Sequence, residues 1–355
     1  TMKIAILTDT HTGVKNGSDV FIDYTERFYS EVFFPTCQAQ GITQILHLGD
    51  YFDHRKYLNY KVLSRNRAMF LDKLEEYGMT MDIIPGNHDT FFRNTNSLCS
   101  LTELLQYHSK HVNVIMSPTV KDYDGLSVAL LPWITVENYA ESCAFIEKAN
   151  APIIGAHLEL AGFEMMKGAP AVSHGMPADL FSRYEMVLSG HYHTKSSRGN
   201  IHYLGVPYEI TWADCNDPKY FHILDTSTRE LAEIRNPLSL FKRLTYDDSN
   251  GPVANVEPSE VSGTYIKVVV TSKKDPYSFD KYIDSINAGE PFDLKIVESF
   301  IEYSADSIDD DTIEVSDTPS LLNSYVDAIE TDLDKTRIKT KLQELYLESQ
   351  LIDGI

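Results

Sequence analysis

The sequence predicts an α/β fold in which two β-sheets pack together between helices, followed by a small α+β domain and C-terminal helices. The chain has 355 residues, which is too many for one ordinary core and suits two domains plus an appendage. Residues 1–90 alternate between apolar strand-like runs and helical runs, as in a largely parallel sheet. Residues 91–225 are richer in strand-like runs separated by Gly, Pro and Asp, and from these we infer the second sheet.

Each predicted strand is a short apolar run that ends at polar residues. In the first sheet we expect strands at residues 3–7, 43–48 and 80–84, with helices at 19–40 and 59–77 between them. In the second sheet we expect strands at residues 126–131, 152–156, 185–189, 201–204 and 220–225. Because α/β sheets bind ligands at the carboxyl ends of their strands, the polar residues after these runs are the candidate site.

The first two segments of the chain are predicted to be folded domains. Residues 1–238 form the main domain, which closes at a candidate boundary in residues 226–238. Residues 239–302 form a small α+β domain, with its clearest strand at 265–270 and a helix at 277–287.

The end of the chain is predicted to be a linker and two helices. Residues 303–319 are acidic and poor in apolar clusters, which predicts a flexible linker. Residues 320–355 carry apolar side chains at helical spacing, which predicts two short amphipathic helices. Such helices either fold back on the body or dock on another protein, and we favour a partner.

The charge of the chain bears on its partners. The net charge is −21, and residues 301–355 contribute 4 Lys or Arg against 14 Asp or Glu, a net of −10. Residues 1–225 contribute 18 against 26, a net of −8. A protein that grips nucleic acid alone usually shows a basic face. This acidity argues against tight autonomous DNA binding but not against DNA delivered as a substrate by a partner.

The location is predicted from what the sequence lacks. No run approaches the ~20 apolar residues of a membrane span, and the apolar start is too short for a signal peptide. The four cysteines are widely spaced with no CxxC pair, which suits free thiols in a reducing cytoplasm. We therefore expect a cytoplasmic protein with no membrane partner.

Five short polar motifs follow apolar runs, and together they predict a site for two divalent metal ions. In order they are Asp9-Thr10-His11, Gly49-Asp50, Gly86-Asn87-His88-Asp89, Gly155-Ala156-His157 and Gly190-His191-Tyr192-His193. The candidate metal ligands are the carboxylates, imidazoles and amide of Asp9, His11, Asp50, Asn87, His157, His191 and His193. Mixed nitrogen and oxygen ligands suit Mn²⁺, Fe or Zn²⁺ better than Ca²⁺. We expect Mn²⁺, with Mg²⁺ as the alternative.

Such a pair of metals points to phosphoryl chemistry. Two ions ~3.5–4 Å apart stabilise both the attacking and the leaving oxygen of a displacement and lower the pKa of a water towards ~7. Asp50 is the candidate bridging carboxylate. His88 is the candidate catalytic residue, which either protonates the leaving oxygen or stabilises charge on the phosphorus, and Asp89 is expected to orient it.

Each motif has a simpler interpretation when it is taken alone. A single Asp after a strand is more often a turn or a helix cap, and a lone His-x-His is more often not a metal site. The joint pattern reverses these odds. The remaining histidines lack that support, and His47 is interpreted as a core residue. The residues near the motifs that are candidates for substrate contact are Asp53, His54, Arg55 and His174.

The five motifs resemble, in order, the D-x-H, G-D, G-N-H-D/E, G-H and G-H-x-H signatures of the calcineurin-like metallophosphoesterases. The resemblance implies a fold of two facing mixed sheets flanked by helices. It implies one metal on Asp9, His11, Asp50 and His193, and a second on Asp50, Asn87, His157 and His191. It also implies that His88 is the catalytic histidine.

Within this family the chain most resembles the SbcD-type DNA repair nucleases, including phage-encoded members. The motif Gly49-Asp50-Tyr51-Phe52-Asp53 follows their G-D-[IL]-F-[DH] pattern, and Asp89 stands where protein phosphatases usually have Glu. Residues 203–208 and 216–221 resemble their Y-x-G-[ST]-P and D-P-[KR]-G-[FY] run. The order of a nuclease domain, a small capping domain and C-terminal helices also matches.

This resemblance implies a nuclease that works with a partner. It implies a 3′→5′ exonuclease and endonuclease in double-strand-break processing and recombination, in the host cytoplasm if the chain is phage-encoded. It implies that residues 320–355 bind an SMC-like ABC ATPase and that the nuclease is a homodimer within a heterotetramer. The chain departs from the pattern at Asp53, where archaeal and eukaryotic relatives have His, and at Val206, where Ser or Thr is common.

Two other functions fit part of the sequence. Residues 49–55 approach the G-D-Y-V-D-R-G motif of protein Ser/Thr phosphatases, but Arg55 is displaced by one position and no H-G-G run follows His157. A non-catalytic regulator of the ATPase would need no intact site. All the ligands and His88 are present, which argues against that interpretation.

Overall fold

The computed structural model describes residues 2–108, 110–298, 323, 326–327 and 333–352. The chain divides into two compact units. The first comprises Thr1–Tyr208, Pro218–Asn236 and Thr318–Ile355, and the second comprises Glu209–Asp217 and Pro237–Asp317. The main domain was predicted to run without interruption to residue 238, whereas the segment Glu209–Asp217 groups with the second unit. The roles assigned to the predicted domains stay predictions.

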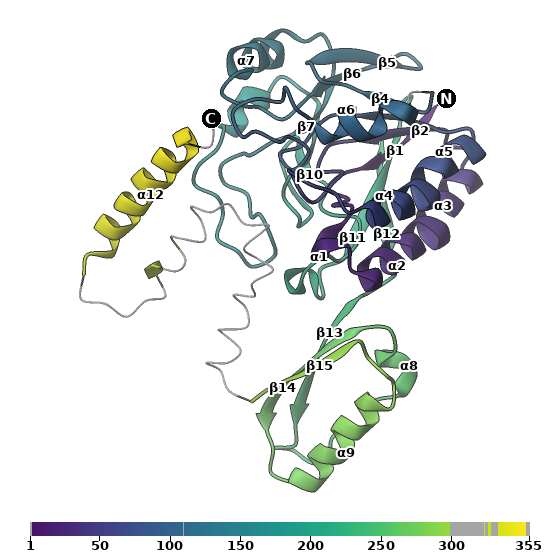
Figure 1. Cartoon of the computed structure of the whole chain (residues 1–355), viewed down its shortest axis with the longest axis vertical. Helices are drawn as coiled ribbons and strands as arrows, with labels where there is room; N and C mark the ends of the chain where they lie inside the picture. The colour runs from purple at the N-terminus through teal and green to yellow at the C-terminus, as the bar shows by residue number, and fades with distance from the viewer. Residues whose placement is uncertain (1, 109, 299–322, 324–325, 328–332, 353–355) are drawn as a thin grey trace. The chain divides into compact units, whose positions relative to one another are not determined.

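Two six-stranded mixed sheets form the body of the first unit, which confirms the predicted two-sheet α/β fold (Figure 1). The first sheet has the order β12 (Leu231–Asn236), β11 (Lys219–Asp225), β1 (Lys3–Leu7), β2 (Gln44–His47), β3 (Thr80–Ile83) and β4 (Val112–Val114). The second has the order β5 (Thr119–Tyr123), β6 (Leu126–Leu131), β7 (Ile153–His157), β8 (Met186–Gly190), β10 (Ile201–Tyr203) and β9 (Ser196–Arg198).

Strands that lie next to each other in these sheets are parallel where the site forms. β1, β2, β3 and β4 run parallel, and so do β6, β7, β8 and β10. Antiparallel strands lie at the margins, where β11 pairs with β1 and β5 pairs with β6. As a result, several strands of each sheet end at one edge, and the residues that follow them can converge. The strand predicted at 220–225 is β11, and its expected place in the second sheet was wrong, because it pairs with β1 in the first.

The core between the two sheets is apolar on both sides. One cluster of buried residues joins Ile4 and Leu46 of the first sheet, and Ile84 directly after β3, to Leu130 and Leu188 of the second sheet. Strands buried on both faces read as continuous apolar runs rather than alternating ones, which is why the sequence pattern located them.

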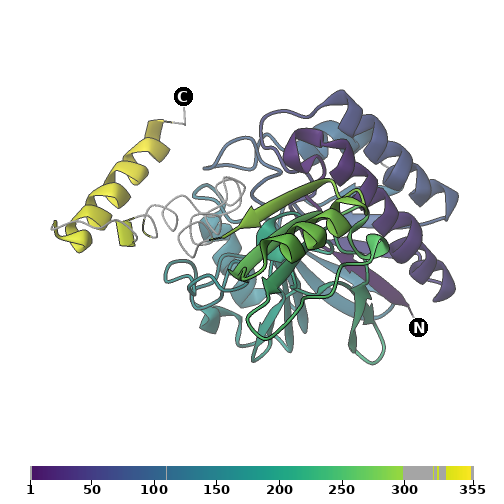
Figure 2. The same ribbon diagram turned by 90° about the horizontal axis from the view of Figure 1, so that it is seen from below.

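Helices cover the outer faces of the sheets. On the first sheet, α2 (Asp19–Arg27) and α3 (Phe34–Ala39) are joined by a π-helical segment η1 (Phe28–Phe33), and α4 (Tyr60–Asn66) and α5 (Asp72–Glu76) by another, η2 (Arg67–Leu71). Figures 1 and 2 show the two runs side by side. Phe33 packs on Phe221 of β11, with ring centroids 5.1 Å apart. On the second sheet, α7 (Tyr139–Lys148) packs through Ile146.

Shorter helices connect these elements in the first unit. They are α1 (Val14–Gly17), α6 (Ser100–Leu105) and the 3₁₀ segments η3 (Gln106–His108) and η4 (Ala178–Phe181). The helices predicted at 19–40 and 59–77 are confirmed, each with a π-helical interruption that periodicity does not reveal.

The chain passes from the first unit to the second inside the candidate boundary at residues 226–238, between Asn236 and Pro237. Six of its residues form β12, which pairs with β11 from Leu224↔Leu231 to Lys219↔Asn236. The turn between them is held by Asp225, whose Oδ1 accepts hydrogen bonds from the N–H groups of Ser227 and Thr228. The part of the candidate boundary that precedes Pro237 is therefore a hairpin turn and an edge strand of the first sheet.

The second unit is a three-stranded parallel sheet with helices. Its strands are β13 (Phe241–Asp247), β14 (Tyr265–Ser272) and β15 (Asp293–Val297), and its helices are η5 (Trp212–Asp214), α8 (Pro258–Val261) and α9 (Pro276–Asn287). Figure 1 shows α9 lying along one face of the sheet. Phe279 and Ile286 of α9 pack on Ile266 and Val268 of β14. The predicted strand at 265–270 and helix at 277–287 are confirmed.

Part of the predicted C-terminal region is described. The helix α12 (Lys335–Ile352) covers the second predicted amphipathic series, and Oδ1 of Asp334 accepts a hydrogen bond from the N–H of Thr336 at its start. The predicted linker at 303–319 lies outside the described residues, and so does most of the first predicted helix. Among the helices that the structure describes, none has the length and apolar character needed to cross a membrane.

Candidate dinuclear metal centre

The five motifs follow strands that are neighbours in their sheets. Asp9 and His11 follow β1, Asp50 follows β2, and Asn87 follows β3. His157 ends β7, and the His191–His193 motif follows β8, which pairs with β7. The parallel arrangement brings all seven predicted ligands to the same edge of the two-sheet body.

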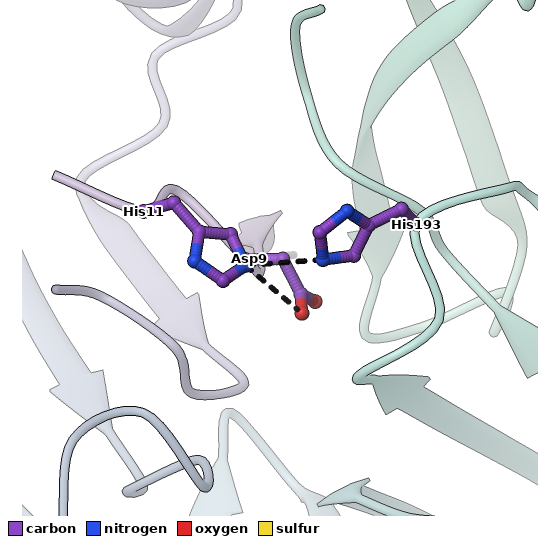
Figure 3. Close-up of side chains that lie close together, drawn as sticks. All are labelled: Asp9, His11 and His193. Carbon is purple, nitrogen blue, oxygen red and sulfur yellow. Dashed lines mark hydrogen bonds and ion pairs between the residues drawn. The ribbon is translucent and has the colours of Figure 1, made fainter. Parts of the chain in front are cut away.

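The first cluster consists of Asp9, His11 and His193, whose ligand atoms lie within 4.8 Å of one another. Figure 3 shows the three side chains pointing toward one another from the loops after β1 and β8. Nε2 of His11 lies 3.1 Å from Nε2 of His193 and 3.9 Å from Oδ1 of Asp9. All three residues are buried.

The second cluster consists of Asp50, His157 and His191, with Asn87 between the two imidazoles. Nε2 of His157 lies 3.2 Å from Oδ2 of Asp50. Oδ1 of Asn87 lies 3.1 Å from Nε2 of His157 and 3.0 Å from Nδ1 of His191. The amide oxygen of Asn87 therefore lies beside both imidazoles, and its role as a neutral ligand stays a prediction.

Asp50 reaches both clusters. Its Oδ2 lies 3.2 Å from Nε2 of His157 and 3.9 Å from Nε2 of His11. Its Oδ1 accepts a hydrogen bond from the N–H of His88 at 2.8 Å. This is the position that a bridging carboxylate requires, although bridging itself stays a prediction.

In two of the histidines, a contact to Nδ1 orients the ring so that Nε2 points into the site. Nδ1 of His157 lies 2.8 Å from the carbonyl oxygen of Leu48, and Nδ1 of His11 lies 3.1 Å from Oδ1 of Asp53. An Nδ1–H that donates to oxygen leaves Nε2 with its lone pair free for a metal. In both rings that nitrogen faces the other ligands.

The buried charges of the site perturb one another strongly. Burial alone lowers the pKa of His11, but its hydrogen bond to Asp53 and the charges of Asp50 and Asp9 raise that pKa to about 9. Burial raises the pKa of Asp9 above its ordinary value. Burial also opposes ionisation of Asp50, yet the charge of His157 keeps the pKa of Asp50 well below its usual range. Carboxylates held this far from water favour a compensating cation.

The donor set fits a pair of transition-metal ions. Two donors bound to one ion at ~2.1 Å lie ~3–3.5 Å apart when they subtend ~90–110°. The separations of 3.1 Å between His11 and His193 and of 3.0–3.2 Å in the second cluster agree with this. Residues Asp9, His11, Asp50 and His193 would hold one ion, and Asp50, Asn87, His157 and His191 the other.

The backbone of several ligands is strained. Asp9, His11, Asp50 and His191 all have positive φ angles, of 50°, 42°, 54° and 89°. Non-glycine residues with such angles are uncommon, cost of order 1–3 kcal/mol each and cluster at functional sites. This strain is a second, independent sign that the loops are shaped for ligand geometry rather than for stability.

Two glycines allow the ligands to approach closely. A Cβ atom on Gly86 would lie 2.2 Å from Oδ1 of Asp50, and one on Gly190 would lie 2.7 Å from Oδ2 of Asp9. Both distances are far below van der Waals contact. The glycine that precedes Asn87 and the one that precedes His191 are therefore required by space.

His88 lies beside the first cluster, but Asp89 does not orient it. The His88 ring meets the His11 ring edge-on, with centroids 5.0 Å apart, and its Nδ1 lies 2.6 Å from the carbonyl oxygen of Asp53. Asp89 is buried and accepts hydrogen bonds from the N–H groups of Asp50, Tyr51, Phe52 and Gly86. The expected contact between Asp89 and His88 was wrong, since Asp89 instead holds the loop that carries Asp50.

Of the four predicted substrate contacts, Asp53 faces the protein rather than solvent. It is 7% exposed, and its carboxylate pairs with the ring of His11. Asp53 thus holds a predicted metal ligand with its side chain and His88 with its main chain. A role in touching DNA directly does not follow from this position.

The other three predicted contacts lie outside the ligand clusters. His54 is stacked on Tyr57 with ring centroids 4.7 Å apart, and Arg55 is half-buried. His174 is 2.8 Å from Glu159, whose charge also acts on His191. Contact of these residues with substrate stays a prediction.

Sequence reasoning missed Trp133. Its ring packs on the two imidazoles of the second cluster, with centroids 5.7 Å from His157 and 5.2 Å from His191. Trp133 lies two residues after β6, which is parallel to β7. The rule that located the ligands, namely inspecting the residues after each strand, would also have found it.

A two-sheet body with paired metal-ligand clusters at the strand ends defines a metallophosphoesterase. The chain belongs to the calcineurin-like phosphoesterase family, whose model matches residues 2–195. The predicted family resemblance is therefore confirmed.

The chain is similar over nearly its whole length to exonuclease subunit 1 of Enterobacteria phage T4. The two are 31% identical over 351 residues, which cover 98% of this chain and 99% of that protein. A component of the nuclease SbcCD of Escherichia coli (strain K12) is 21% identical over 341 residues, covering 83% of this chain and 84% of the relative. The structure of an archaeal phosphodiesterase, 15% identical, covers 66% of this chain and matches all of that one with a TM-score of 0.35.

Proposed function

We propose that the protein is a two-metal-dependent DNA nuclease that hydrolyses phosphodiester bonds as a 3′→5′ exonuclease and an endonuclease. The observation that carries the proposal is the pair of ligand clusters that meet at Asp50, with His88 beside them. The similarity to a phage exonuclease over 98% of the chain supports a nuclease over a phosphatase of proteins. It equally favours an enzyme over a non-catalytic regulator.

In the proposed reaction the metal ions and the side chains of the site would have separate roles. Two divalent ions, Mn²⁺ by preference or Mg²⁺, supply positive charge that polarises the phosphodiester and lowers the pKa of a water. Asp53 holds Nδ1 of His88 through its carbonyl oxygen, which fixes the ring so that Nε2 can serve as the proton donor to the leaving oxygen. His11, His157 and Asn87 are held in place by contacts within the site rather than by solvent.

The decisive experiment compares wild type with His88→Ser on labelled linear duplex DNA in the presence of Mn²⁺. We expect the variant to lose roughly 10²–10⁴-fold in cleavage rate, as loss of a positioned acid does, while it still binds Mn²⁺. His108→Ser is the matched control, because His108 lies in η3, outside the clusters. Equal cleavage by wild type and His88→Ser would refute the proposal.

We further propose that an SMC-like ABC ATPase binds residues 320–355 and delivers DNA to the site, with two copies of the nuclease in a heterotetramer in the host cytoplasm. The proposal is supported by the similarity to one component of a multi-subunit nuclease and by the acidity of this chain. Deletion of residues 320–355 should abolish capture of the ATPase and spare cleavage of single strands. Capture that persists after the deletion would refute this assignment.

A further inference from the structure

We propose that a cavity beside the metal centre binds one nucleobase of a single-stranded DNA substrate by stacking. The inference rests on the proposed nuclease function and identifies how the strand is held. The cavity measures about 400 Å³ and lies between the loop after β1 and the segment that leads into α4. Its lining includes Gly17, His54, Tyr57, Asn59, Tyr60 and Val62.

The walls of the cavity present aromatic faces to solvent. Tyr57 is 65% exposed and Tyr60 is 88% exposed, although large aromatic rings are usually buried. Tyr57 is stacked on His54 at an interplanar angle of 21°, which leaves its other face open. A planar group could therefore continue the stack that His54 and Tyr57 begin.

Contacts within the protein hold the floor of the cavity in place. Val62 is buried and packs close to Gly13 and Gly17, which have φ angles of +92° and +71°. Oδ1 of Asn59 caps α4 by accepting a hydrogen bond from the N–H of Lys61. The exposed rings therefore stand on a fixed support, and binding would require little reorganisation.

The cavity is directly connected to the proposed chemistry. His54, in its wall, follows Asp53 in the chain, and Nε2 of His54 lies 3.7 Å from Oδ2 of Asp53. The same Asp53 holds His11 through its carboxylate and His88 through its carbonyl oxygen. A base seated against His54 and Tyr57 would place its own phosphate group near His88.

The charge of this segment favours nucleic acid over an apolar peptide. Residues 54–61 read His-Arg-Lys-Tyr-Leu-Asn-Tyr-Lys, with three cations and no carboxylate, in a chain whose net charge is −21. Nζ of Lys61 pairs with Oδ1 of Asp19 at 2.8 Å, so the cations that carry the proposal are Arg55 and Lys56. Cations that track the backbone and aromatic faces that accept bases are the two components of sequence-independent single-strand binding. Both occur here within eight consecutive residues.

The test measures binding of a short oligothymidylate by the full-length protein without divalent metal, so that no cleavage occurs. One oligonucleotide carries all its bases. Each oligonucleotide of a second series lacks one base, and the abasic position moves along the strand from one to the next. A stacked base contributes ~1–3 kcal/mol, so wild type should prefer the first by roughly 5- to 150-fold at one position. Tyr57→Ala and Tyr60→Ala should lower this ratio toward one, whereas Tyr57→Phe should keep it.

The control is Tyr107→Ala, because Tyr107 is 85% exposed but lies in η3, outside the cavity. The proposal is overturned if wild type shows no preference for bases, if it does not bind the oligonucleotide, or if Tyr57→Ala and Tyr60→Ala keep the wild-type ratio. Since the measurement needs no catalysis, a base preference without any cleavage would refute the nuclease function alone.

Discussion

Replacing Gly190 by alanine tests how tightly the metal ligands are packed. The φ angle of Gly190 lies outside the left-handed region, so the backbone itself would accept alanine. The added Cβ would lie 2.0 Å from Oγ1 of Thr8 and 2.7 Å from Oδ2 of Asp9, whereas ordinary contact begins at 3.4 Å. The two atoms would have to retreat by about 1.4 Å and 0.7 Å. Both residues are buried, and Thr8 donates a hydrogen bond to Asp9 at 2.6 Å.

The size of the effect follows from these displacements. Overfilling a packed interior typically costs ~1–3 kcal/mol of stability. Metal sites tolerate ligand displacements of only ~0.2 Å, so a carboxylate moved by about 0.7 Å is lost or weakened as a ligand. Disturbing the groups that orient ligands lowers metal affinity by ~10–100-fold, and we expect a loss in this range for Mn²⁺.

The assay is calorimetric titration of the metal-free protein with Mn²⁺, together with unfolding in denaturant. Thr8→Ala removes the atom nearest the new methyl group, so the double variant should recover part of the lost stability, as a double-mutant cycle reveals. The reasoning is refuted if Gly190→Ala binds Mn²⁺ within about twofold of wild type and unfolds at the same denaturant concentration.

Three further outcomes are expected. Burial lowers the pKa of His222 to about 4, so between pH 4 and 6.5 the unfolded chain binds a proton that the folded chain does not. The free energy of unfolding should therefore fall by about 3 kcal/mol as pH drops through that window. The difference in this free energy between wild type and His222→Gln should show the same fall, and a difference that does not change with pH would contradict it. In a Trp212→Phe background, Trp133 fluorescence should change on Mn²⁺ binding, because its ring packs on the second cluster; an unchanged spectrum at saturation would show that this cluster is not occupied. Asp53→Ala should weaken Mn²⁺ binding ~10–100-fold but keep most of the cleavage rate at saturating metal, because the main-chain contact to His88 persists; a collapse of the saturated rate instead would show that the carboxylate acts on His88.

The sequence predicted the strands that carry the site because those strands are buried on both faces. Runs such as residues 126–131 are mostly apolar and do not alternate with polar residues as half-exposed strands do. The polar residue that ends each run is therefore easy to identify. Short strands with exposed or mixed faces were missed. β12 and β9 are examples, since their composition does not differ from that of turns.

The residues that form the two clusters were predictable, but the contacts that arrange them were not. Residue type and order were enough to select Asp50 and His157, because few other roles need those groups after strands. The direction of the Asp89 side chain depended on the path of the loop at residues 50–52, whose N–H groups collect around its carboxylate. The pairing of Asp53 with His11 joins loops after two different strands, so it arises only from tertiary structure. Neither contact can be predicted from the sequence around the residues that form it.

The charge of the chain is the reason we propose that the site needs a partner to bind DNA. Residues 1–225 have a net charge of −8, and two divalent ions would reduce it to −4, which still repels DNA. Arg55 and Lys56 are a local exception, since Lys61 in the same segment pairs with Asp19. If they make the main phosphate contacts, the logarithm of single-strand affinity should fall with the logarithm of salt concentration at a slope of about −1.4, from ~0.7 per phosphate neutralised. A slope as steep as those of basic DNA-binding proteins, measured on this chain alone, would mean that another cationic surface binds the strand. A shallow slope that steepens when the ATPase is added would mean that the partner supplies the remaining phosphate contacts.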